Sequence, residues 1–119
     1  MVEIRRVDTG EVVASLTHPR RVSAIAWGDG GRLLAAGTDE GAVDVWEVAT
    51  SSRLMSLQGH SAAVTALLFH PAGKVLVSAG LDDTTRIWDL FRGRQLLAAP
   101  GLALGWRANG QQLAFRRGD

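Results

Sequence analysis

The sequence predicts an all-β fold, on three observations. The chain repeats itself, because His18 and Trp46 recur as His60 and Trp88 at an offset of 42 residues. Almost every segment is a short run of β-forming residues bounded by Gly, Pro, Asp, Asn or Ser. Apolar residues do not follow the 3.6-residue spacing of a helix over a useful length. A repeat of about 40–45 residues is typical of arrays in which each repeat forms one small sheet.

The expected strands follow one another between turn signals. Those before the second repeat are expected at residues 2–7, 11–17, 22–27, 33–37, 42–48 and 53–57. Turns with Gly, Asp or Ser separate them, at residues 8–10, 28–31, 39–41 and 50–52. The remaining strands are expected at residues 64–69, 75–78, 84–90, 95–98, 103–107 and 111–115. Such short, evenly spaced strands favour antiparallel pairing between neighbours.

The second repeat carries the fuller sequence pattern. It opens with Gly59-His60, continues over residues 64–73 as Val-Thr-Ala-Leu-Leu-Phe-His-Pro-Ala-Gly, and closes with Trp88-Asp89. This pattern resembles the WD-repeat family of β-propellers, in which each blade is a four-stranded antiparallel sheet. The first repeat is a degraded copy, since Thr17-His18 opens it and Trp46-Glu47 closes it.

The resemblance implies a partial propeller arc of blades. It divides the chain into an outer half blade (residues 2–17), two blades (22–58 and 64–99) and an inner half blade (103–117). These amount to three blades, whereas closed propellers use about four to eight. We therefore expect either a fragment of a larger propeller or self-assembly of copies to close the ring. The fragment is favoured, because the outer repeats lack the polar caps that terminal repeats need.

The resemblance also implies a structural tetrad of hydrogen-bonded side chains in the second repeat: His60, Ser78, Asp82 and Trp88. A buried network in which every member is satisfied would fix the geometry of one blade. A Ser, a His and an Asp within reach of one another also resemble a hydrolase triad. The sequence around Ser78 does not form a nucleophile elbow, so no catalytic residue is predicted.

In the first repeat the tetrad is expected to be degenerate. His18, Glu40 and Trp46 occupy three of the four positions, but Ala36 stands where the second repeat has Ser78. His18 and Glu40 could still pair, and Thr38 lies two residues from the serine position. The hydrogen-bond chain is therefore expected to be broken in this repeat.

Partner-binding positions are carried over from the family in the same way. Partners of WD repeats often contact residues at the narrow rim of the ring, which correspond here to Arg21, Ser23, Asp39, Ala63, Thr65 and Leu81. The alternative is that these are ordinary rim residues, because loops carry function but also merely connect strands.

Composition excludes several classes of function. Thirteen basic and twelve acidic residues leave a net charge of +1, which argues against nucleic-acid or membrane partners. The sequence has no cysteine, and its three histidines are not spaced as ligands, so no metal or other cofactor is expected. The four tryptophans are interpreted as core or tetrad residues and not as a stacking platform for nucleic acid. With no apolar run of about 18 residues and no signal core, a cytoplasmic chain is expected.

These observations lead to two hypotheses of function. The first is a non-catalytic WD-repeat scaffold that mediates protein–protein interaction, within a larger multidomain protein. The alternative is an enzymatic or small-ligand-binding propeller with a site at the ring centre. The inner strands begin Val-Ser-Ala at residues 22–24 and Val-Thr-Ala at residues 64–66. Because neither start carries a cluster of ionisable residues, the scaffold is favoured, with a protein or peptide partner.

Overall fold

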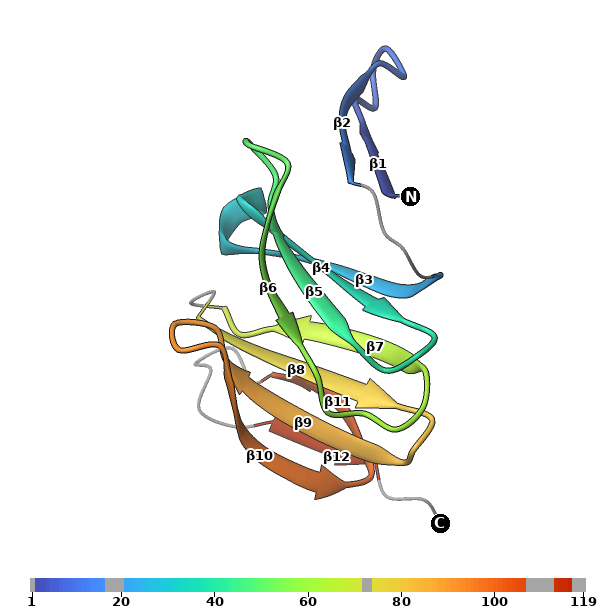
Figure 1. Cartoon of the computed structure of the whole chain (residues 1–119), viewed down its shortest axis with the longest axis vertical. Coiled ribbons are helices and arrows are strands. Elements are labelled where there is room, and N and C mark those ends of the chain that lie inside the picture. Colours follow the sequence, from blue (N-terminus) through green and yellow to red (C-terminus); the bar gives the residue numbers. More distant parts are fainter. Residues whose placement is uncertain (1, 17–20, 72–73, 107–112, 117–119) are drawn as a thin grey trace.

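The computed structural model describes residues 2–16, 21–71, 74–106 and 113–116, and it is all-β as predicted (Figure 1). In this part of the chain there are twelve strands and one 3₁₀ turn, η1 (Asp29–Gly31). The first six strands are β1 (Val2–Arg5), β2 (Val12–Leu16), β3 (Val22–Gly28), β4 (Leu33–Thr38), β5 (Val43–Glu47) and β6 (Ser52–Leu57). The other six are β7 (Val64–Phe69), β8 (Val75–Gly80), β9 (Thr84–Asp89), β10 (Arg94–Pro100), β11 (Leu102–Trp106) and β12 (Leu113–Arg116).

The strands form two four-stranded sheets and two strand pairs. Blade 1 is the sheet β3-β4-β5-β6, and blade 2 is the sheet β7-β8-β9-β10. Strands that are neighbours in the chain pair antiparallel throughout each blade, because short turns can join only antiparallel strands. The pairs β1-β2 and β11-β12 stand at the two ends of the arc (Figure 1).

The main hydrophobic core lies between the two blades. Blade 1 contributes Leu33, Ala35, Val43, Val45 and Leu57, and blade 2 contributes Val64, Leu67, Leu76, Trp88 and Leu90. The inner strands β3 and β7 lie side by side, and the Ser23 hydroxyl donates to the Val64 carbonyl across the junction at 2.6 Å. The Phe69 ring packs so closely on Gly28 that any side chain there would collide with it.

One sequence interpretation is wrong for the part that the structure describes. Trp27 was expected in the core, but it is 50% exposed, whereas Phe69, its counterpart 42 residues later, is partly buried. Phe69 is covered because blade 1 precedes it. Among the described side chains, the β1-β2 pair packs on the corresponding face of blade 1 at Leu34 and Trp46, through Val2 and Ile4. The inner part of that face, which includes Trp27, is left open among the described residues.

The C-terminal strand pair continues the stacking on the other side of blade 2. Strand β11 packs against β8 and β9, and the Thr85 hydroxyl donates to the Gly101 carbonyl at 2.6 Å. Over the described residues, the structure contains no helix of the length and apolar character needed to span a membrane.

Candidate functional site

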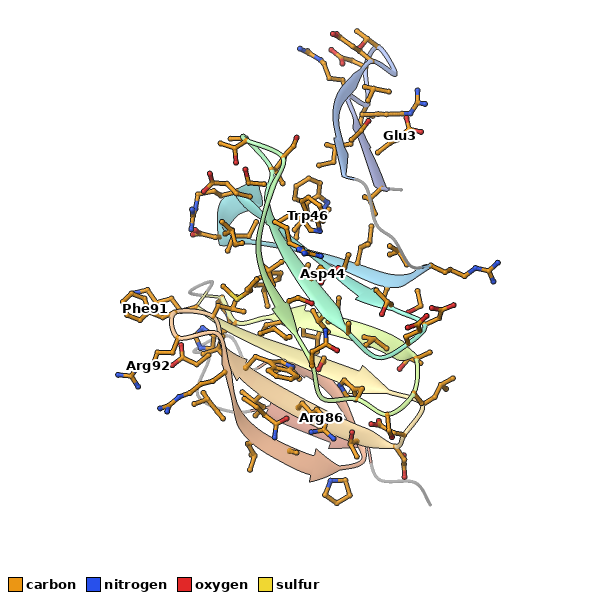
Figure 2. All side chains as sticks on the ribbon, in the orientation of Figure 1. Glu3, Asp44, Trp46, Arg86, Phe91 and Arg92 are labelled. Atoms are coloured by element: carbon orange, nitrogen blue, oxygen red, sulfur yellow. The ribbon has the colours of Figure 1, made fainter. Side chains whose placement is uncertain are left out.

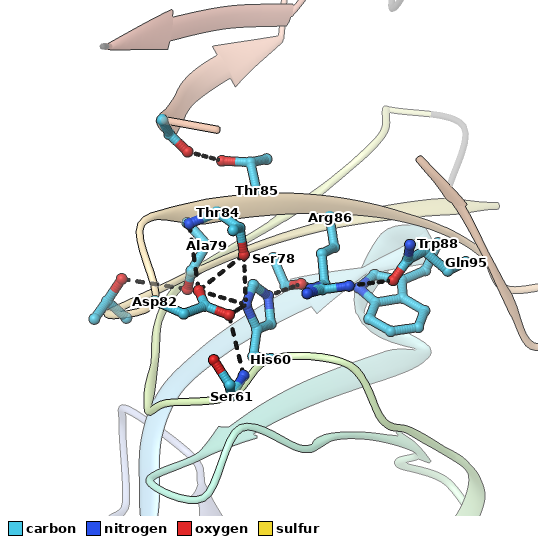
Figure 3. A network of polar contacts seen from close by, with 12 residues as sticks. His60, Ser61, Ser78, Ala79, Asp82, Thr84, Thr85, Arg86, Trp88 and Gln95 are labelled. Carbon is cyan, nitrogen blue, oxygen red and sulfur yellow. Dashed lines mark hydrogen bonds and ion pairs between the residues drawn. The ribbon is translucent and has the colours of Figure 1, made fainter. Parts of the chain in front are cut away.

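Blade 2 brings the four predicted tetrad side chains together at hydrogen-bond distance (Figure 3). His60 precedes β7, Ser78 lies on β8, Asp82 lies in the β8–β9 turn and Trp88 lies on β9. His60 Nδ1 is 3.1 Å from Asp82 Oδ1, and His60 Nε2 is 2.7 Å from Ser78 Oγ. The Trp88 indole N–H donates to Ser78 Oγ at 2.8 Å. Four side chains from separate elements thus form one continuous chain.

The chemistry of the donors assigns the hydrogens in this chain. An indole N–H can only donate, so the Ser78 oxygen accepts from Trp88 and directs its own hydrogen to His60 Nε2. His60 then carries its hydrogen on Nδ1, facing a carboxylate that can only accept. In this tautomer each member of the chain has a hydrogen-bond partner.

Two further residues hold the Asp82 carboxylate. The Ser61 backbone N–H donates to Oδ2 at 3.0 Å, and the Thr84 hydroxyl donates to Oδ1 at 2.8 Å. Neither residue was predicted as a site residue from the sequence. A threonine two positions after an aspartate is a common turn pattern and could have signalled the second contact. The first is a backbone contact, which the type of side chain does not reveal.

These contacts decide the charge of Asp82. Burial alone would raise the pKa of its carboxyl, but the Ser61 N–H, the Thr84 hydroxyl and the His60 imidazole outweigh burial and lower the pKa to about 2. The carboxylate therefore stays ionised over the whole neutral and mildly acidic range. In that state it orients the imidazole ring and fixes its tautomer.

The lowered pKa predicts a loss of stability in acid. Because the pKa of Asp82 is lower in the folded state than in the unfolded chain, its contribution, about 2 kcal/mol, is complete above about pH 4. The contribution is lost as the pH falls towards 2. Urea unfolding of the purified chain and of Asp82→Asn, at neutral pH and at about pH 2–3, tests this. The gap between the two proteins is expected to narrow in acid; a constant gap would contradict the assignment.

The tetrad has the residue types of a hydrolase triad, but a substrate cannot reach its serine. Ser78 is 0% exposed, on the second strand of a sheet with neighbours on both sides. Its oxygen already accepts from Trp88 inside a fully buried site, so no substrate carbonyl can approach it. The arrangement can lock β8, β9 and the turn before β7 together. Its geometry is that of a structural clamp.

Blade 1 lacks the equivalent chain at the described positions. Ala36 is fully buried at the serine position, and Trp46 is buried beside it. The Thr38 hydroxyl bonds within its own hairpin, accepting from the Ala42 N–H at 3.1 Å. Glu40 is exposed at the turn, and His18 lies outside the described residues, so the predicted pairing of His18 with Glu40 stays a prediction.

Four of the six predicted rim positions form two equivalent pairs, one in each blade. In blade 1 the Asp39 N–H donates to the Arg21 carbonyl at 3.0 Å, and in blade 2 the Leu81 N–H donates to the Ala63 carbonyl at 2.9 Å. Arg21 and Asp39 are exposed, and Leu81 is 71% exposed, while Ala63 is half-buried. These backbone contacts bring the start of the inner strand and the β-hairpin of each blade to one edge. Binding of a partner there stays a prediction.

The two hydroxyl residues of the predicted rim bond to backbone. Ser23 donates to Val64, and its oxygen also lies 3.2 Å from the Gly37 carbonyl. Thr65 donates to the Ala79 carbonyl at 3.2 Å. Both hydroxyls therefore tie strands together. Across the described ranges, no group of three or more His, Cys, Asp or Glu residues could hold a metal ion.

Comparisons with known proteins agree with this geometry. The family WD domain, G-beta repeat matches residues 10–47 and 51–89, which together are more than half of the chain. The chain is 33% identical to the Periodic tryptophan protein 2 homolog of Mus musculus, over 82% of this chain and 11% of that protein. It is 36% identical to the NACHT domain- and WD repeat-containing protein 1 of the same organism, over 72% and 6%. The chain thus spans a small fraction of the relatives that it matches.

A solved structure shows the same arrangement of strands. The β-propeller domain of Cps50 (Swd1) from Myceliophteria thermophila superposes with a TM-score of 0.71 at 25% identity. The alignment covers 76% of this chain and 28% of that one. The family model thus matches the two repeats, and the solved structure matches the blade geometry.

Proposed function

The chain belongs to the WD-repeat family of β-propellers, and on this premise we propose that it is a non-catalytic scaffold that binds a protein or peptide partner. WD proteins are generally scaffolds. The proposed contact surface is the edge where the inner strands begin, formed by Arg21 and Asp39 of blade 1 and Ala63 and Leu81 of blade 2. We further propose that the chain acts within a larger multidomain protein.

The observation that carries this proposal is a contrast within one hairpin. Ser78 has the chemistry of a nucleophile but is fully buried and bonded on both sides. Leu81, three residues later, has no catalytic chemistry but is 71% exposed on a turn that a backbone hydrogen bond fixes. An exposed apolar side chain on a rigid support favours contact with a partner surface. The hairpin therefore favours binding of a partner through Leu81 over catalysis by Ser78.

Site-specific crosslinking in the whole protein tests this proposal. A photoreactive phenylalanine analogue at Leu81 is expected to capture a discrete protein partner in cells. The matched control is the same analogue at Leu96, which is also exposed, but on the outer strand β10. Capture at Leu81 alone supports the proposed edge. Equal capture at both positions, or none at Leu81, would contradict it.

A further inference from the structure

A second surface lies at the opposite end of the blades from Leu81. Leu81 lies in the turn that enters β9, and Phe91 lies in the turn that leaves it, so the two are at opposite ends of one strand. Beside Phe91 a groove of about 220 Å³ runs between the two blades. Its apolar lining comes from Leu33, Val45, Leu54 and Met55 of blade 1 and from Leu90 and Phe91 of blade 2. Both blades are complete, so the groove does not result from missing strands.

Phe91 is the most informative residue of this surface. It is 85% exposed, and Figure 2 shows it pointing away from the blades, next to Arg92. Asp89 Oδ1 accepts the N–H groups of Phe91 and Arg92, at 2.9 and 3.3 Å, so the turn is held in one conformation. The equivalent residue of blade 1 is Ala49, which shows that a blade does not require an aromatic side chain here. A pre-organised, exposed aromatic residue beside an apolar groove is typical of an interaction anchor.

The charges around the groove are unbalanced. Arg32 is paired on both sides, with Asp29 at 2.6 Å and with Glu47 at 3.1 Å. Lys74 occupies the equivalent position of blade 2, and its backbone carbonyl accepts from Leu90 as that of Arg32 does from Val48. Within the described residues, Lys74, Arg92 and Arg94 form no ion pair. The Asp89 carboxylate accepts two backbone N–H groups of the same turn through Oδ1 and keeps its negative charge, so four basic side chains (Arg32, Lys74, Arg92, Arg94) stand against three carboxylates (Asp29, Glu47, Asp89) here.

We propose that this groove binds an acidic peptide segment of a partner, with one apolar side chain inserted between the blades against Phe91. Carboxylates flanking that side chain would pair with Lys74 and Arg92, because oppositely charged surfaces select a partner and fix its register. The lining favours a peptide over a nucleic acid, since aliphatic side chains dominate it and Phe91 is the one aromatic residue among its described members. The proposal rests on the scaffold function but uses a surface separate from the Leu81 edge.

Peptide selection on the whole protein tests the proposal. A phage-displayed library of random peptides is panned on the immobilised protein, and the binders are synthesised for fluorescence anisotropy. Peptides with acidic residues around one large apolar residue are expected. Phe91→Ala should weaken their binding by about tenfold or more. Lys74→Glu should weaken it as well, and added salt should do so progressively.

Matched variants separate this site from the Leu81 edge. Leu96→Ala removes an exposed leucine outside the groove, and Leu81→Ala alters the other surface; both should leave the affinity unchanged. Binders that depend on Leu81 and not on Phe91 would support the scaffold function but contradict the proposal that the groove binds a peptide. Enrichment of basic or neutral peptides, or no Phe91-dependent binder, would also overturn it. The proposal would also be contradicted if the protein bound oligothymidylate, or associated with itself, and Phe91→Ala abolished that interaction.

Discussion

Replacing Asp82 with alanine is expected to lower the free energy of unfolding by about 1–3 kcal/mol. The carboxylate accepts from four donors, so its removal leaves the His60 imidazole, the Ser61 N–H and both the N–H and the hydroxyl of Thr84 without their acceptor. The contacts of His60 and of the Thr84 hydroxyl are half-buried, so water cannot fully replace the carboxylate there. Urea unfolding midpoints of the purified chain and of the Asp82→Ala variant measure the loss.

Glu40→Ala is the matched control for this experiment. Glu40 occupies the position equivalent to Asp82 but is exposed, and its repeat has Ala36 in place of the serine. Its replacement is expected to lower stability by less. If both variants lost the same free energy of unfolding, the continuous hydrogen-bond chain would not stabilise blade 2. That result would contradict the assigned role of the tetrad.

Gly41→Ala is expected to destabilise the protein by about 2–4 kcal/mol, through backbone strain and a collision together. Gly41 has a φ of +95°, where an L-residue is strained. A Cβ there would also collide with the His60 carbonyl oxygen and lie 2.9 Å from that of Ala62. These are backbone atoms of the segment that leads into blade 2, so they cannot move away without displacing His60. The same unfolding measurement applies.

Gly31→Ala separates the two causes. Gly31 has a similar φ of +90°, but nothing lies within 4 Å of the position of an added Cβ. Its replacement should therefore show the backbone strain alone, about 1–2 kcal/mol. The excess loss in Gly41→Ala measures how closely the blade 1 hairpin approaches the His60 segment. Similar losses in both variants would contradict that close approach.

The tetrad could be predicted from the sequence because the resemblance to the WD-repeat family implied all four of its members. His60, Ser78, Asp82 and Trp88 keep the spacing of a four-stranded unit, and antiparallel pairing of short strands converts that spacing into contact. The all-β class followed from the same periodicity. Strand ends were predicted less well: β10, for example, extends over Arg94–Pro100, whereas residues 95–98 were expected.

Burial across a blade junction could not be predicted in the same way. Trp27 and Phe69 occupy equivalent positions and have similar chemistry, yet one is half-exposed and the other packs on Gly28. The difference depends on whether another blade lies on that face, and the residue's own repeat carries no information about this. Each blade buries its faces only against its neighbours.

The groove beside Phe91 could not be predicted from the sequence for a related reason. Its lining comes from both blades, from positions that a single repeat does not connect. The one available signal was a difference between the repeats, since Phe91 stands where blade 1 has Ala49. In a repeat protein, positions that depart from the repeat pattern are those that the shared architecture does not explain.

Reaction with a fluorophosphonate can show whether the Ser78, His60 and Asp82 side chains hold a blade together without performing hydrolysis. The reagent labels serines that a histidine activates and a substrate can reach. The folded, purified protein is treated and analysed by intact mass and peptide mapping. We expect no adduct at Ser78, because its hydroxyl is fully buried and bonded to His60 and Trp88. A stoichiometric adduct at Ser78 that disappears in His60→Ala would contradict this structural role.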